Sequence, residues 1–263
     1  MPNSALHVAR TGLEAQDARM RVIANNLANI GTTGFKRDRA DFATLAYQEM
    51  RIAGQQSTGE TTYAVGLNLG TGVQVMGTSR IEAQGTLNQT GNALDLALEG
   101  SGFFQVELPG GGEIAYTRAG NFTLSPEGQL VTGQGYSLTP PIQVPAGAQA
   151  ITVATDGTVS ATQPGQSTPI QIGQLQVANF VNPAGLRAIG DNFLAETAAS
   201  GPADSGIAGQ NGRGNIRQGM LETSNVNVVE ELVEMIEAQR AYEINSKMVS
   251  SVDEMLRNAN QTL

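Results

Sequence analysis

The chain has 263 residues, of which 40% are hydrophobic and 5% aromatic, and its 24 acidic and 15 basic residues give a net charge of −9 at pH 7. A chain of this length and hydrophobicity can bury a core, while its acidic balance argues against a nucleic-acid-binding protein. The absence of cysteine excludes disulfide bonds and thiolate metal sites.

The first thirty residues predict an amphipathic helix. Its apolar stripe consists of two interleaved sets. The first set is Leu6, Leu13, Met20 and Leu27, which recur every seven residues, and the second lies three positions after each of them and has only Gln16 as a polar member. This spacing is typical of a coiled-coil stripe. Charged residues interrupt every apolar run, and the whole sequence lacks an apolar stretch of about 18 residues, so we expect neither a secretory signal peptide nor membrane insertion.

The stretch ANNLANIGTTGFK at residues 24–36 predicts the end of this helix. Three asparagines lower its helix propensity, so we expect their amides to hydrogen bond to free carbonyl groups or to neighbouring backbone and to fix the register of packed helices. Two glycines then permit the left-handed conformations that end a helix, and a phenylalanine can anchor the chain beyond it. A polar helix terminus with a glycine stop is the simpler alternative. These junction and register candidates are Asn25, Asn26, Asn29, Gly31, Gly34 and Phe35.

Residues 70–220 predict β structure. The segments GFFQVEL and EIAYTRAG alternate apolar and other residues on either side of PGGG, as in a β-hairpin. The segments SPEG at residues 125–128 and TDGT at residues 155–158 mark further turns. Short strands between closely spaced turns are typical of an all-β domain, which we place at residues 73–196. The loop-like segments around it, residues 35–72 and 197–225, predict extended connectors.

The C-terminal segment predicts a second, longer helix. Val228, Met235, Tyr242 and Val249 recur every seven residues, and a second mostly apolar set follows three positions after the later ones. Asn227 is placed to cap the start of this helix, and the glutamates of its first turn complement the helix dipole.

Both helices carry an apolar stripe with no partner nearby in sequence, so the simplest arrangement pairs residues 1–34 with residues 226–263 as a coiled coil. We therefore predict an α+β fold with paired N- and C-terminal helices, a central and mostly antiparallel β domain, and extended connectors between them. Such a pair leaves apolar positions for neighbouring subunits, which favours self-assembly, and an intramolecular helix pair packed on the β domain is an equal alternative. The predicted helical core consists of Leu6, Leu13, Met20, Leu27, Val228, Met235, Tyr242 and Val249.

Residues suited to catalysis are scarce. The only histidine, His7, has no serine, cysteine or aspartate partner at a recognisable spacing, and the helix dipole explains the glutamates of the C-terminal helix. No Walker or dinucleotide-binding motif occurs. We predict neither enzymatic activity nor a cofactor or metal site.

Longer motifs at both ends resemble a known family. The stretches ANNLANIGTTGFKR and SNVNVVEELVEMIEAQRAYEINSKMVSSVDEML resemble the N- and C-terminal signatures of the bacterial flagellar rod and hook family. Between them, LALEGSGFFQV, YTRAGNFTLSPEGQLVT and GYSLTPPIQVP are also similar to that family, so the resemblance covers nearly the whole chain. The length and the stretch YQEMRIAGQQSTGETTYAVGLNLGTGVQV are most similar to the distal-rod branch. A proximal rod subunit of similar size is the nearest alternative.

The resemblance implies a structural subunit of the distal rod in the flagellar basal body, whose paired terminal helices stack into a helical tube. Such a tube would act as a drive shaft that transmits torque from motor to hook, and it would enclose the export channel. The implied partners are further copies of the chain, proximal rod and hook subunits, the P and L rings and the flagellar type III export apparatus. The rod would span the periplasm to the outer membrane, after export without a cleaved signal peptide.

Residues 46–72 are implied to be an additional subunit-contact segment that makes the rod straight and stiff, although simple linkers would also fit their glycine-rich sequence. From the residues alone, two other classes stay open. A monomeric periplasmic β-rich binding module would leave two long amphipathic helices unexplained. An enzyme acting on the cell wall would need an acid, a base or a metal site, and the sequence suggests none.

Overall fold

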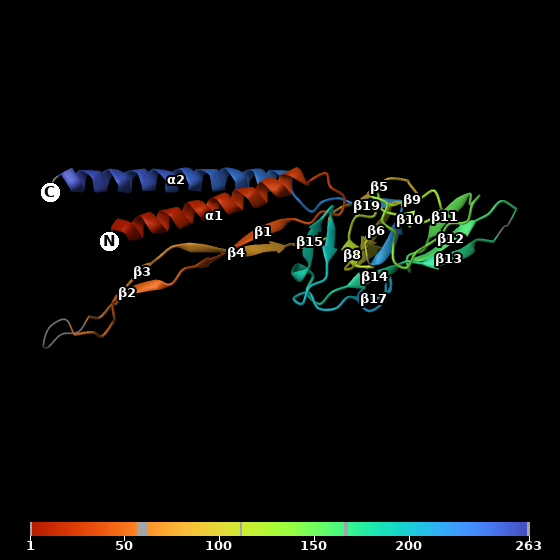
Figure 1. Cartoon of the computed structure of the whole chain (residues 1–263), viewed down its shortest axis with the longest axis horizontal. Helices are drawn as coiled ribbons and strands as arrows, with labels where there is room; N and C mark the ends of the chain where they lie inside the picture. The colour runs from red at the N-terminus through yellow and green to blue at the C-terminus, as the bar shows by residue number, and fades with distance from the viewer. Residues whose placement is uncertain (1, 57–62, 111, 166–167, 262–263) are drawn as a thin grey trace. The chain divides into compact units, whose positions relative to one another are not determined.

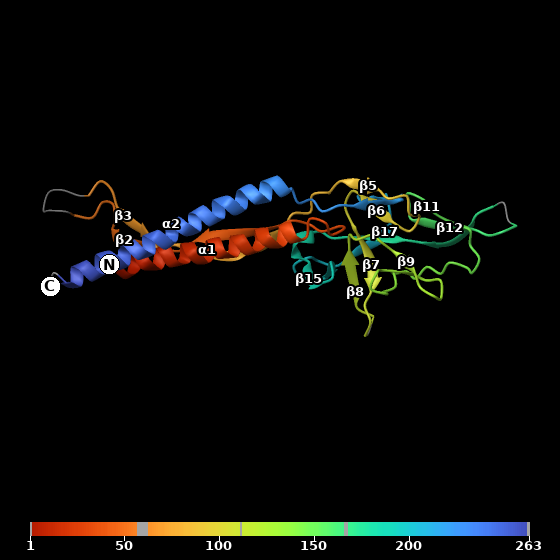
Figure 2. The ribbon, with the colours of Figure 1, turned by 90° about the horizontal axis from the view of Figure 1, so that it is seen from above.

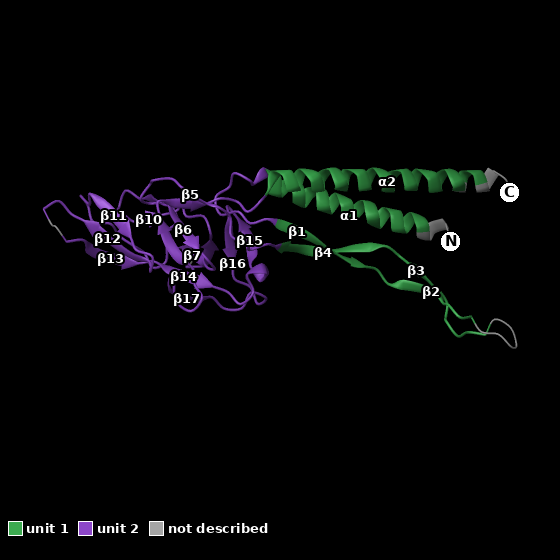
Figure 3. Ribbon diagram, turned by 180° about the vertical axis from the view of Figure 1, so that it is seen from behind, with its two compact units in different colours: residues 1–27, 38–79, 227–263 green, residues 28–37, 80–226 purple. Residues whose placement is uncertain are grey.

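A computed structural model describes residues 2–56, 63–110, 112–165 and 168–261 (Figures 1 and 2). The chain forms two compact units, which Figure 3 distinguishes by colour. The first unit comprises Met1–Leu27, Asp38–Ser79 and Asn227–Leu263, and the second comprises Ala28–Arg37 and Arg80–Val226. A helix at each end of the chain and a β-rich middle confirm the predicted α+β class.

Two long helices and two β ribbons make up the first unit. The helices lie side by side in both views (Figures 1 and 2). Strands β1 and β4 pair with each other, and β2 and β3 form an antiparallel hairpin. The elements of this unit are α1 (Pro2–Ala28), β1 (Asp38–Thr44), β2 (Tyr47–Arg51), β3 (Leu67–Gly70), β4 (Val73–Arg80) and α2 (Val228–Gln261).

An asparagine cap fixes the start of α2. The side-chain oxygen of Asn227 accepts a hydrogen bond from the backbone N–H of Val229 at 3.0 Å. The backbone oxygen of Asn227 accepts another from the N–H of Glu231, also at 3.0 Å. Glu230 and Glu231 add negative charge at the positive end of the helix dipole. The predicted cap is therefore confirmed.

A six-stranded antiparallel sheet is the largest sheet of the second unit, with the strand order β15-β16-β8-β7-β14-β17. Its strands are β7 (Phe103–Glu107), β8 (Ile114–Thr117), β14 (Gln176–Asn179), β15 (Arg187–Gly190), β16 (Phe193–Ala195) and β17 (Asp204–Ile207). A 3-10 turn at Pro183–Gly185 connects β14 to β15.

The described residues of this unit also form four smaller antiparallel sheets. They pair β5 (Leu87–Gln89) with β19 (Met220–Glu222), β6 (Leu96–Glu99) with β18 (Asn215–Gln218), and β9 (Thr123–Leu124) with β10 (Leu130–Val131), and they join β11 (Ala150–Val153), β12 (Thr158–Thr162) and β13 (Ile170–Gln174). The mostly antiparallel β core agrees with the sequence prediction.

Three apolar clusters contain residues of β7, the smallest of them through Val106. The ring of Phe104 meets that of Phe122 edge to face, with centroids 5.2 Å apart, inside the largest cluster. Phe103 belongs to a second cluster, in which the rings of Tyr116 and Phe180 lie 4.8 Å apart. Because successive side chains of a strand point to opposite faces, these clusters cover both faces of the sheet. The second unit therefore has a core of its own.

Local turn signals predicted three hairpins of this unit correctly. Strands β7 and β8 pair on either side of the PGGG segment, with Glu107 opposite Ile114. In the SPEG turn, the N–H of Gly128 donates to the carbonyl oxygen of Ser125 at 2.9 Å, and Gly128 has a φ of +80°. In the TDGT turn, Gly157 has a φ of +89°. Glycine suits these two positions because it reaches positive φ without steric cost.

The segments predicted as connectors contain strands. Residues 197–225 include β17, β18 and β19, and residues 35–72 include β1, β2 and β3. The glycines there serve close packing as well as turns, since a Cβ on Gly214 would lie 2.7 Å from the carbonyl oxygen of Glu99. The glycine-rich sequence suggested a linker. In the structure, however, the missing side chain of glycine permits two strands to approach each other closely.

Candidate assembly surface

Exposed apolar side chains concentrate in the first unit. Among the described residues, the large hydrophobic side chains exposed in the second unit are Leu124, Ile170, Val181 and Ile189. Those exposed in the first unit are Val8, Phe42, Tyr47, Met50, Ile52, Val65, Leu67, Leu69, Val75, Met76, Val228, Val229, Leu232, Val233, Ile236, Tyr242, Ile244, Met248 and Met255. Apolar exposure on this scale marks an interaction surface rather than a finished monomer surface.

Helix α2 has apolar residues on two opposite sides, and Arg240 interrupts the exposed set between Ile236 and Ile244. Its inner face, toward α1, contains the buried side chains of Ala238 and Val252. On the other side, Val229, Val233, Ile236 and Ile244 follow helical spacing and expose 69%, 50%, 50% and 62% of their surface. We refer to these four residues as the outer α2 face. The seven-residue repeat does not reveal this face, because the four residues lie outside the repeat positions.

Polar contacts join the inner face of α2 to α1. The guanidinium Nη2 of Arg19 lies 3.5 Å from a carboxylate oxygen of Glu234 and 3.7 Å from one of Glu237. Gly12 of α1 faces Asn245 of α2 closely, since a Cβ on Gly12 would lie 3.0 Å from the side-chain nitrogen of Asn245. These contacts set which residues of the two helices lie opposite one another.

The side chain of Asn26 connects three elements of the first unit. Its side chain is 1% exposed, and its Nδ2 donates to the carbonyl oxygen of Asp38 at 2.8 Å and to Oε2 of Glu231 at 3.2 Å. Its Oδ1 accepts from the N–H of Asp38 at 3.0 Å. One buried amide thus joins α1, β1 and α2, which is the geometry expected of a register residue. Asn29 bonds locally, to the hydroxyl of Thr32, and Asn25 is exposed.

The two candidate glycines differ. Gly34 has a φ of +68°, and a Cβ there would lie 2.6 Å from the carbonyl carbon of Arg118, so this position requires glycine. Gly31 has no positive φ and has open space around it, so the expected left-handed conformation occurs at Gly34 alone. Phe35, next to Gly34, is buried.

The predicted stripe residues differ in burial. Val228 and Tyr242 are 41% and 40% exposed. The half-buried members are Leu6, Leu13, Met20, Leu27, Met235 and Val249. The buried apolar residues of the helices are Ala9, Ala15, Ile23, Ala238 and Val252. Ala9 and Ala15 are small enough to permit a close approach of α1 to its neighbours. Helix α1 also contacts the β1–β4 ribbon, where the N–H of Val73 donates to the hydroxyl of Thr11 at 3.4 Å.

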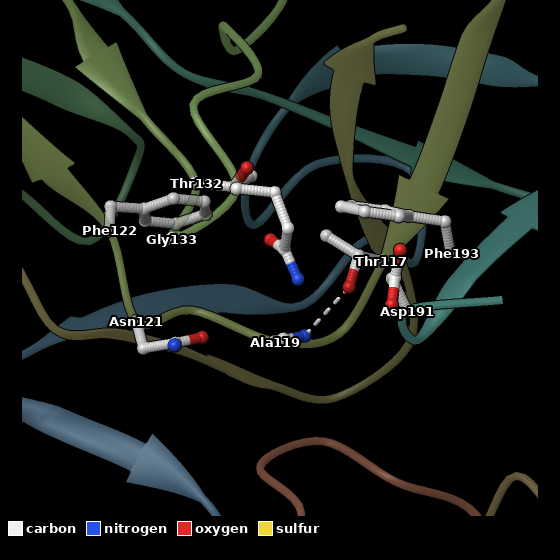
Figure 4. Close-up of a pocket in the computed structure, with 9 residues that line it drawn as sticks. Thr117, Ala119, Asn121, Phe122, Thr132, Gly133, Asp191 and Phe193 are labelled. Atoms are coloured by element: carbon white, nitrogen blue, oxygen red, sulfur yellow. Dashed lines mark hydrogen bonds between the residues drawn. The ribbon is translucent and has the colours of Figure 1, made fainter. Parts of the chain in front are cut away.

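Two cavities have linings without a catalytic arrangement. A groove of about 320 Å³ beside α1 is lined by His7, Thr11, Glu14, Leu45, Val73, Gln74 and Val75. Nδ1 of His7 lies 3.2 Å from the carbonyl oxygen of Thr71. Figure 4 shows a smaller pocket of about 70 Å³ in the second unit, where the hydroxyl of Thr117 accepts from the N–H of Ala119 at 3.1 Å. Its lining also includes Asn121, Phe122, Thr132, Gly133, Gln134, Asp191 and Phe193.

Among the residues that the structure describes, no cluster of three histidine, aspartate or glutamate side chains is placed to hold a metal ion. Within the same residues, neither helix combines the length and the hydropathy that a membrane-spanning segment requires.

Comparison with known proteins shows similarity along the whole chain. Residues 6–36 match the family described as flagella basal body rod protein, residues 97–161 match the flagellar hook protein FlgE/F/G D1 domain, and residues 217–262 match the flagellar basal body rod FlgEFG protein C-terminal family. The flagellar basal-body rod protein FlgG of Buchnera aphidicola subsp. Acyrthosiphon pisum is 51% identical over 98% of both chains. The chain belongs to the flagellar basal-body rod protein family.

Sequence identity to two relatives from one organism shows which branch of this rod family the chain resembles more. FlgG of Caulobacter vibrioides is 46% identical to the chain over 98% of both sequences. FlgF of the same organism is 32% identical over 99% of this chain and 98% of its own. The nearer similarity to FlgG confirms the predicted structural subunit of the flagellar distal rod. As a member of the rod family, the protein is a structural component of the basal body and not an enzyme.

Proposed function

We propose that α1 and α2 pair as a coiled coil in the assembled rod and that copies of this pair stack into a helical tube around the export channel. The first unit would form the inner part of this tube and the β-rich second unit the outer part. The exposed apolar surface of the first unit supports this proposal, because neighbouring copies would bury it. Several chains would then enclose the eight predicted core residues, which are Leu6, Leu13, Met20, Leu27, Val228, Met235, Tyr242 and Val249.

The tube would transmit torque from motor to hook and would contact proximal rod and hook subunits at its two ends. It would span the periplasm to the outer membrane inside the P and L rings. Subunits would reach it through the flagellar export apparatus without a cleaved signal peptide. In this arrangement Asn26 would hold the register between α1 and α2, with Asn25, Asn29, Gly31, Gly34 and Phe35 at the junction.

Electron microscopy of the purified full-length protein at rising concentration tests the proposal. The comparison protein lacks residues 1–27 and 227–263, which removes both helices and leaves Gly34 and Phe35 with the β unit. We expect straight tubes from the full chain and a folded, unassembled β unit from the shortened one. A full-length chain that stays monomeric at every concentration would favour the binding-module alternative.

The proposed additional contact segment, residues 46–72, contains the β2–β3 hairpin. Residues 57–62 of this segment lie outside the described residues. Exposed Tyr47, Leu67 and Leu69 give it an apolar surface. The hydroxyl of Thr71 donates to the carbonyl oxygen of Ala46 at 2.6 Å, so these two residues can be joined by a short turn.

Replacing residues 47–70 with Asn-Gly is therefore expected to leave both units folded and to produce tubes that are bent or more flexible. The persistence length of the tubes in electron micrographs measures this effect, and circular dichroism checks the fold. Tubes as straight and stiff as those of the full chain would show that the hairpin does not contribute to stiffness.

A further inference from the structure

Three segments of the second unit adjoin the points where the chain passes between the units. These points lie at residues 27–28, 37–38, 79–80 and 226–227, and the adjoining segments are residues 34–37, 80–85 and 222–226. In the described part of the chain, none of the three segments contributes to the apolar clusters of the β core. Phe35 and Val226 are buried in these segments, and polar contacts add to their attachment.

Backbone and amide hydrogen bonds connect all three segments. The N–H of Arg37 donates to Oδ1 of Asn225 at 2.7 Å, and the N–H of Ile81 donates to the carbonyl oxygen of Arg37 at 2.8 Å. Nδ2 of Asn225 donates to the carbonyl oxygens of Ile81 at 2.8 Å and Ala83 at 3.0 Å. A single asparagine side chain therefore bonds to both of the other segments.

A buried ion cluster joins the same segments a second time. Oε1 of Glu222 accepts from Nζ of Lys36 at 2.6 Å and from the N–H of Gly85 at 2.9 Å, and its Oε2 accepts from Nη1 of Arg118 at 3.3 Å. Nζ of Lys36 also donates to the carbonyl oxygen of Ala83 at 2.8 Å. The side chains of Lys36, Arg118 and Glu222 are 4%, 6% and 0% exposed.

The charges of this cluster depend on one another. Burial lowers the pKa of Lys36, and the hydrogen bond and charge of Glu222 oppose that shift. Burial raises the pKa of the neighbouring Glu82 carboxyl, against the charges of Arg80, Lys36 and Arg118. Neutralising Glu222 would remove the one negative charge that hydrogen bonds to both Lys36 and Arg118 among the described contacts, which is far more costly than the loss of an exposed ion pair.

We propose that Lys36, Arg118, Glu222 and Asn225 form a clamp that holds the three segments together where the chain enters and leaves the β unit. The clamp opens as a local unit, separately from the apolar core. Mechanical force transmitted along the chain between the units must pass through these segments. The clamp resists this force by keeping the ends of the segments at fixed positions. This inference concerns the second unit and does not depend on assembly into a tube.

Amide hydrogen exchange of the full-length chain tests the clamp, since exchange reports local opening. Glu222→Gln keeps the shape of the side chain and removes its charge. The N–H of Gly34 donates to the carbonyl oxygen of Glu222 at 2.8 Å, so it reports on the clamp together with Arg37 and Ile81. We expect exchange at these three amides to accelerate by about 100-fold or more, with the amides of β7 and β14 unchanged. Equal acceleration in β7 and β14, or none at the clamp, would overturn the proposal.

A matched control is available in the same unit. Glu99 also pairs across strands with an arginine, Arg217, at 2.8 Å, but both side chains are nearly half exposed. Glu99→Gln should leave exchange at Gly34, Arg37 and Ile81 unchanged. If Glu222→Gln does not fold, Asn225→Ala tests the clamp instead. This substitution removes the hydrogen bonds between the same segments without leaving a buried charge unpaired. It should accelerate exchange at Arg37 and Ile81 by about 10-fold and spare β7 and β14.

Discussion

Replacing Phe104 with alanine is expected to lower the free energy of unfolding of the full-length chain's β unit by about 3–5 kcal/mol. Phe104 has no exposed surface and lies in the largest apolar cluster, edge to face with Phe122. The substitution removes the burial of a whole ring and leaves a cavity that the surrounding strands can fill only in part. Urea unfolding followed by circular dichroism measures the change, with the helical signal treated as a separate transition.

Leu124→Ala is the matched control for this experiment. Leu124 belongs to the same unit, in β9, but it is among the exposed hydrophobic residues. Its truncation creates no cavity and should change the free energy of unfolding by less than about 1 kcal/mol. Similar losses from Phe104→Ala and Leu124→Ala would show that the cluster around Phe104 is not the stabilising core of the unit.

The features predicted correctly are those with local causes. A seven-residue apolar repeat and the Asn227 cap defined the helices, and the glycines of the SPEG and TDGT segments defined turns, because each signal lies within a few residues of its effect. The apolar alternations of GFFQVEL, on Phe104 and Val106, and of EIAYTRAG, on Ile114 and Tyr116, likewise marked β7 and β8.

The features that were missed depend on partners far away in the sequence. Strand β18 pairs with β6, more than a hundred residues earlier, and its own glycine-rich surroundings carry no strand signal. The bond between Lys36 and Glu222 spans 186 residues, and neither residue stands out from its neighbours in the sequence. Burial that arises from distant chain segments cannot be recognised from spacing, so the ion cluster became apparent only in the fold.

Asn26 illustrates the limit within the candidate site itself. The sequence indicated that the asparagines near the end of α1 require hydrogen-bond partners, because they weaken a helix. It did not distinguish Asn26, which bonds to both Asp38 and Glu231, from Asn25, which is exposed. That distinction depends on which side of α1 meets β1 and α2, and two neighbouring residues of a helix point in different directions.

Changing the outer α2 face to an acidic surface should strongly weaken tube formation. In the double variant Ile236→Glu and Ile244→Glu, two exposed isoleucines of this face become charged, while glutamate preserves helix propensity. If neighbouring copies bury this face, each substitution removes the burial of an apolar side chain and places a charge in an apolar contact. We expect the protein concentration needed for assembly to rise by at least about 100-fold, as measured by sedimentation and electron microscopy.

The control for this variant makes the same chemical change in the second unit. Val181 is almost fully exposed and Ile170 is exposed, so Val181→Glu with Ile170→Glu adds equal charge outside α2. This control should form tubes at the concentration of the unaltered chain, and circular dichroism should show intact helices in both variants. Tubes from the Ile236→Glu and Ile244→Glu protein at the unaltered concentration would place the subunit contact elsewhere in the first unit, with the β2–β3 hairpin as the next apolar surface to test. Loss of assembly in both variants would instead indicate that added negative charge, on a chain already at −9, opposes association wherever it is placed.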